Sequence, residues 1–75
     1  MERKYIVHGL APAISRKVNN FLKSCDLGGE GVFVRQTNIV TVELTNTRNV
    51  DLLPEKLKQA YEIECGWHDV SVKEI

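Results

Sequence analysis

The sequence predicts an α+β domain in which two helices cover one face of a four-stranded antiparallel sheet. Short segments in which apolar and polar residues alternate, as is typical of strands, occur at Lys4–His8, Gly31–Leu44 and His68–Ile75. Two other segments repeat apolar residues at intervals of three and four, which is typical of amphipathic helices. Glycine, proline and asparagine separate these segments, so each one is expected to end at a turn.

The first predicted strand, Lys4–His8, leads into the first predicted helix. Gly9 and Pro12 end the strand, and Pro12 suits the first turn of a helix, where its missing N–H costs nothing. We expect Gly28, Gly29 and Gly31 to end this helix. Its buried stripe is predicted to consist of Ile14, Val18, Phe21, Leu22 and Cys25.

The segment Gly31–Leu44 predicts a hairpin, with Gln36, Thr37 and Asn38 at the turn. Alternation gives each strand two faces. The all-apolar positions are expected to face the core, and these are Val32, Val34, Val40, Val42 and Leu44. The mixed face would then carry Phe33, Arg35, Ile39 and Thr41.

A second helix and a last strand complete the predicted elements. Asp51 can cap the helix, Pro54 suits its first turn, and Gly66 suits the position after its end. Trp67 is expected at the end of the core, and His68–Ile75 as the last strand. The helix would bury one stripe, made of Leu53, Leu57, Ala60 and Tyr61.

The predicted order β-α-β-β-α-β corresponds to a ferredoxin-like arrangement over a single domain, residues 1–75. Its strand order would be 4-1-3-2, with both helices on one face. Gly31–Thr37 and His68–Ile75 would then be the edge strands. An apolar edge strand such as 31–37 invites pairing with another chain, so a homodimer through this strand is one expectation.

Composition limits the function classes. Ten basic residues balance ten acidic residues, which argues against a general nucleic-acid footprint. No apolar run approaches the roughly 20 residues of a membrane span, and the N-terminus lacks a signal-peptide core. Two cysteines without a secretory signal favour a reducing environment, so we expect a cytoplasmic protein with no membrane contact.

The sequence contains few residues that could form a catalytic or metal-binding site. Cys25, Cys65 and His68 give three soft ligands, whereas a structural zinc site needs four. His8 precedes the first helix, but no phosphate-binding glycine loop accompanies it and no base is paired with a nucleophile. We therefore predict no enzyme, no metal and no cofactor, with both cysteines reduced and structural.

Two segments resemble, in outline, the short motifs of RNA-recognition domains: Tyr5–Leu10 and Asn38–Leu44. The resemblance implies bases stacked on aromatic side chains of the two central strands. The corresponding positions here hold Ile6, Ile39 and Thr41, which are not aromatic. A nucleic-acid-binding domain with a degenerate sheet face is therefore an alternative, with contacts from Arg16, Lys17, Lys23 and Arg35.

The favoured prediction is a small non-catalytic protein-binding module, an adaptor or an inhibitor that occludes a surface of a larger protein. A phage or mobile-element origin fits such a protein. The predicted partner-binding residues are Phe33, Arg35, Ile39 and Thr41. A further alternative, a dimeric sensor of a small ligand, would need a cleft at a dimer interface.

Overall fold

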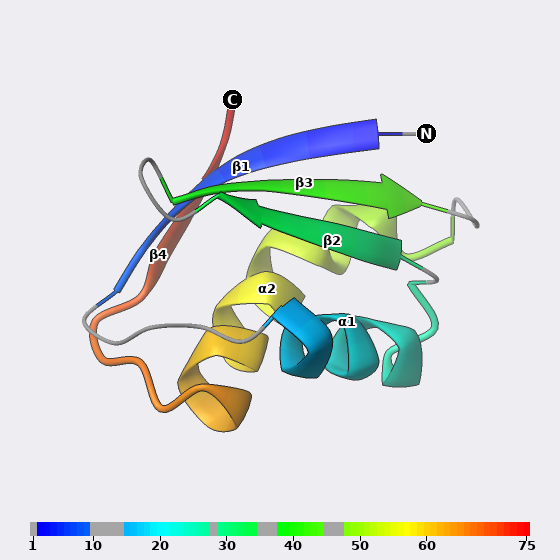
Figure 1. Ribbon diagram of the computed structural model, residues 1–75. Helices are drawn as coiled ribbons and strands as arrows, with labels where there is room; N and C mark the ends of the chain where they lie inside the picture. Colours follow the sequence, from blue (N-terminus) through cyan, green and yellow to red (C-terminus); the bar gives the residue numbers. More distant parts are fainter. Residues whose placement is uncertain (1, 10–14, 28, 35–37, 45–47) are drawn as a thin grey trace.

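The fold is a four-stranded antiparallel sheet with two helices, seen in a computed structural model that describes residues 2–9, 15–27, 29–34, 38–44 and 48–75 (Figure 1). For residues 29, 30, 33 and 34 it describes the backbone. The predicted α+β class is confirmed. In chain order the elements are β1 (Glu2–His8), α1 (Ser15–Ser24), β2 (Gly29–Val34), β3 (Ile39–Leu44), the 3-10 turn η1 (Val50–Leu52), α2 (Leu53–Gln59), the π-helical turn η2 (Ala60–Glu64) and β4 (Ser71–Glu74).

The strands lie in the order β2-β3-β1-β4, and all neighbours are antiparallel. Read from the β4 edge, that order is β4-β1-β3-β2. The strands β2 and β4 therefore form the two edges. Both helices lie on the same side of the sheet, so one sheet face is covered and the other is open (Figure 1).

The core lies between the helices and the covered face. Successive side chains of a strand point to opposite faces, so every second residue of β1 and β3 reaches this layer. In β1 these residues are Tyr5 and Val7, which are fully buried. The other buried residues are Val18, Leu22, Leu27, Val40, Val42, Leu44, Leu53, Leu57, Ala60, Tyr61, Trp67 and Val70.

Trp67 closes one end of the core, as predicted, and its exposed fraction is only 4%. Its ring centroid lies 4.6 Å from that of Tyr61. On another side its indole lies against the backbone of Gly9, where a Cβ atom would overlap the ring. A glycine is therefore required at position 9 for the indole to occupy this place.

The helix ends differ from the predictions. After α1, Asp26 takes the left-handed conformation (φ 60°), while the N–H groups of Asp26 and Leu27 bond to Lys23 and Leu22. This pattern is a Schellman motif with aspartate in the usual glycine position. Asp51 lies inside the 3-10 turn η1 and caps no helix, because α2 begins at Leu53. Gly66 does adopt the left-handed conformation expected of it (φ 69°).

Candidate interaction surface

The open face of the sheet carries the side chains that alternate with the core residues. Antiparallel register places residues opposite one another in rows across the strands, and opposite residues share a face. One row contains Glu2, Glu43 and Glu30. The second contains Lys4, Thr41 and Val32, and the third contains Lys73, Ile6, Ile39 and Val34. We call these ten positions, together with His8 and Ser71, the open face.

The centre of the open face is apolar. Ile6 and Ile39 lie opposite each other and are each half-buried, as is Thr41 in the next row. Val32, opposite Thr41, is 61% exposed, which is unusual for a valine within a strand. These four side chains lie together on the face of the sheet that no described helix covers.

A row of acids borders this apolar centre. Glu2 and Glu43 are exposed and directly opposite each other, and Glu30 holds the next register position on β2. Like charges directly opposite one another in a sheet are destabilising. Exposed lysines, Lys4 and Lys73, lie in the other two rows, so the open face carries charges of both signs.

The four predicted partner-binding residues do not all lie on the same face of the described sheet. Ile39 and Thr41 lie on the open face as predicted. The grouping with Phe33 is wrong, because Phe33 is opposite the buried Val40 and therefore occupies a core-facing position of the register. Arg35 lies outside the described residues. Val32 was expected to face the core, but it lies on the open face and is exposed.

The cause of this error is the register of the hairpin. Val34 is opposite Ile39, so four residues separate the paired positions. A predicted turn confined to residues 36–38 would put the opposite parity of β2 on the open face. Because side chains alternate with a period of two, a shift of one residue exchanges the faces of a whole strand.

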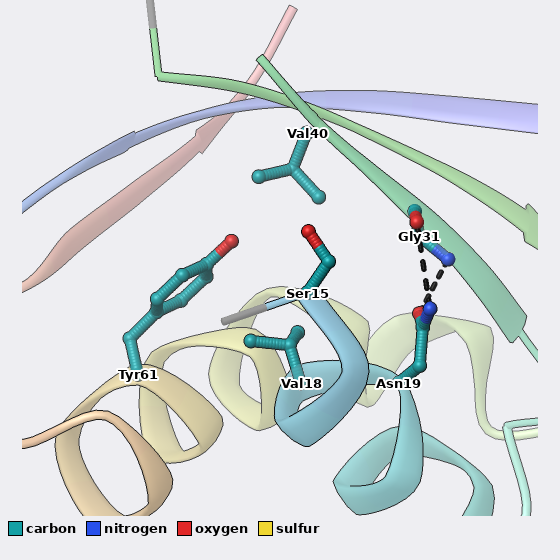
Figure 2. Close-up of a pocket in the computed structure, with 6 residues that line it drawn as sticks. All are labelled: Ser15, Val18, Asn19, Gly31, Val40 and Tyr61. Atoms are coloured by element: carbon teal, nitrogen blue, oxygen red, sulfur yellow. Dashed lines mark hydrogen bonds between the residues drawn. The ribbon is translucent and has the colours of Figure 1, made fainter. Parts of the chain in front are cut away.

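The outer edge of β2 is met by a side chain from α1. Asn19 Nδ2 donates to the backbone oxygen of Gly31 over 3.4 Å, and Asn19 Oδ1 accepts a hydrogen bond from the N–H of Gly31. Figure 2 shows both bonds. The predicted edge strand is thus an edge, but one of its residues already has both backbone groups bonded. Residues 35–37 of that predicted strand lie outside the described residues.

The basic residues lie in a different layer. Arg16, Lys17 and Lys23 are all exposed on α1, and α1 lies on the covered side of the sheet (Figure 1). They are therefore far from the apolar centre of the open face in the arrangement of the layers. These three cations thus do not share a surface with the predicted protein contacts that lie on the open face, while Arg35, which was predicted for both sets, lies outside the described residues.

A hollow between α1, β2 and β3 is too small for most ligands. Its volume is about 10 Å³, which is room for about one water molecule, whereas ligand pockets are typically about 300–1,000 Å³. Figure 2 shows the side chains that line it: Ser15, Val18, Asn19, Val40 and Tyr61, with Gly31 at its rim. Burial raises the pKa of Tyr61 well above its ordinary value, so this hydroxyl stays protonated at neutral pH.

The cysteines and acids do not assemble a metal centre within the part of the chain that the structure describes. Cys25 and Cys65 are half-buried, unbonded thiols that pack against the core. Near β4, Arg3 forms an ion pair with Glu74 over 3.4 Å. Burial raises the pKa of the Tyr5 hydroxyl, and the neighbouring Arg3 opposes part of that shift.

Comparisons with known proteins do not assign a family or a function to this chain. Family models, curated proteins and solved structures were compared with this chain, and none matches. Among the described helices, none has the length and apolar character needed to cross a membrane.

Proposed function

We propose that this chain is a non-catalytic protein-binding module with a ferredoxin-like βαββαβ fold. It acts in the cytoplasm as an adaptor or inhibitor, by covering a surface of a larger protein. The observation that carries this proposal is the open face, where an uncovered apolar centre adjoins a row of acids. The proposed contacts are Ile6, Val32, Ile39 and Thr41, with Glu2 and Glu43 at the border.

The charge on the open face specifies the chemistry of the partner. An apolar patch of Ile6, Val32 and Ile39 favours an apolar surface on the partner. The acidic row beside it favours lysine or arginine at the matching edge, since complementary charge steers association and selects partners. The partner that fits is therefore a protein with an apolar patch, with basic residues where it meets the acidic row and acidic residues where it meets Lys4 and Lys73.

A second candidate function, nucleic-acid binding, is favoured by the three exposed cations of α1. Arg16, Lys17 and Lys23 would bind phosphates on the helix side of the molecule. Such binding weakens with salt by about one unit of log–log slope per neutralised phosphate. The open face carries both acids and the lysines Lys4 and Lys73, so its charge does not select a nucleic acid.

The test is capture of a partner from the lysate of the source cell with tagged wild-type chain and two double variants. Ile39→Asp/Thr41→Asp places charges at the centre of the open face. Arg16→Glu/Lys17→Glu reverses the basic helix face and is the matched control. Circular dichroism first checks that both variants are folded.

Each outcome selects one function. A stoichiometric protein retained by the wild type and the helix variant, but lost from Ile39→Asp/Thr41→Asp, supports the proposal. Equal retention by the folded open-face variant overturns it. Nucleic acid that elutes with salt and is lost from Arg16→Glu/Lys17→Glu establishes the second candidate instead.

A further inference from the structure

The edge of β2 is a potential site for strand addition by a second copy of this chain. In an antiparallel strand, the N–H and C=O of one residue point to the same side. Asn19 bonds both groups of Gly31, so these groups point away from β3. Gly29 and Phe33 have the same parity, and their backbone groups share this outer side.

Asn19 imitates the neighbouring strand that β2 lacks on this side. Its amide supplies one donor and one acceptor to a single residue, as a paired strand residue would. Val18, beside it on α1, is buried in the core and holds the helix in place. A Cβ atom on residue 31 would lie 2.7 Å from Asn19 Oδ1, so the glycine permits this close approach (Figure 2).

We infer that Asn19 guards the β2 edge against pairing with β2 of a second copy. The strand is suited to such pairing, because residues 31–34 carry no charge and Val32 is exposed. A two-fold antiparallel pair centred on Gly31 would place Glu30 opposite Val32 and Gly29 opposite Phe33, with no like charges facing each other. The central hydrogen bonds of that pair are the ones that Asn19 occupies.

Removal of the guard should therefore allow association. Asn19→Ala deletes the amide, while Asn20→Ala changes the adjacent, exposed asparagine of the same helix and serves as the matched control. Sedimentation equilibrium over a wide concentration range measures self-association of each chain. We expect Asn19→Ala to self-associate at least tenfold more tightly than Asn20→Ala and the wild type.

Amide hydrogen exchange at Gly31 locates the contact. In dilute Asn19→Ala this amide should exchange at least tenfold faster than in the wild type, and it should become protected again as the concentration rises. Faster exchange of Gly31 with unchanged self-association would overturn the inference, because the edge would then be free and still unpaired.

Two further variants keep the test decisive. Gly31→Ala displaces the same amide from the strand side, so it should also increase association, whether or not Asn19→Ala folds. Asn19→Lys removes the hydrogen bonds but places a charge at the edge, which natural sheets use to block pairing. It should stay as weakly associated as Asn20→Ala. The inference does not depend on the proposed function, because no variant here alters the open face.

Discussion

The two faces of the sheet are built from the same strands and differ in what constrains them. On β3, Val40, Val42 and Leu44 are at most 5% exposed, whereas the alternating Ile39, Thr41 and Glu43 face the open side. The covered face contains apolar side chains that fit the helices. The open face carries two glutamates at facing positions and an exposed valine. Packing against the helices therefore determines the residues of the covered face, whereas no described helix packs against the open face.

The largest effect is expected where the covered side closes around Trp67. Gly9→Ala should lower the free energy of unfolding by about 3 kcal/mol, because the new methyl group overlaps the indole and overpacks the end of the core. Urea denaturation measures the loss. Combining Gly9→Ala with Trp67→Leu should cost less than the sum of the two single changes. Strict additivity would show that the two residues do not meet.

A matched pair of substitutions then compares the two faces directly. Val42→Ala removes a fully buried side chain and should cost about 2 kcal/mol, including the cavity that it leaves. Val32→Ala removes a side chain that is 61% exposed and should change stability by less than about 0.5 kcal/mol. Urea denaturation of both variants measures the contrast. Equal losses would contradict the assignment of Val32 to the open face.

Alternation in the sequence predicted the burial of β3, but not the face of every residue on β2. Three residues of β3 were expected to face the core and all three are buried, namely Val40, Val42 and Leu44. Phe33 and Val32 were misplaced because the face depends on hairpin register, which is set by the length of the turn. Four residues lie between the paired Val34 and Ile39. A hairpin loop of that length, had it been expected, would have given the observed faces of β2.

The local sequence pattern could not predict contacts between segments that are far apart in the sequence. The bond between Asn19 and Gly31 joins residues 12 apart, and asparagine on a helix gives no sign of which strand it will meet. Asp26 replaces the expected glycine at the end of α1, because aspartate tolerates the left-handed conformation. The positions of Glu2, Glu43 and Glu30 in one row depend on the strand register, which the sequence alone did not predict.

Alkaline pH should lower the free energy of unfolding through the buried tyrosines of the covered side. Burial raises the pKa of Tyr61 and Tyr5, so above the unfolded value of about 10 the unfolded chain releases protons that the folded chain retains. Stability is therefore fully present below about pH 10 and falls as the pH rises further, by about 1.4 kcal/mol per pH unit for Tyr61, whose pKa is raised far above the unfolded value. Urea denaturation between pH 8 and 11 measures the fall, in the wild type and in Tyr61→Phe. An identical slope in both would contradict the role of Tyr61.

The smallest expected effect concerns the open face alone. Glu2→Gln should raise the free energy of unfolding by about 0.3 kcal/mol, since Glu2 lies directly opposite Glu43. Added salt should reduce the gain, because exposed charges are screened. Glu55→Gln is the control: Glu55 is in the first turn of α2, where the helix dipole favours a negative charge, so this change should give no gain. If Glu2→Gln gains stability and loses partner binding, the acidic row lowers stability and contributes to recognition. If Glu2→Gln instead loses stability, other contacts compensate the repulsion in the row.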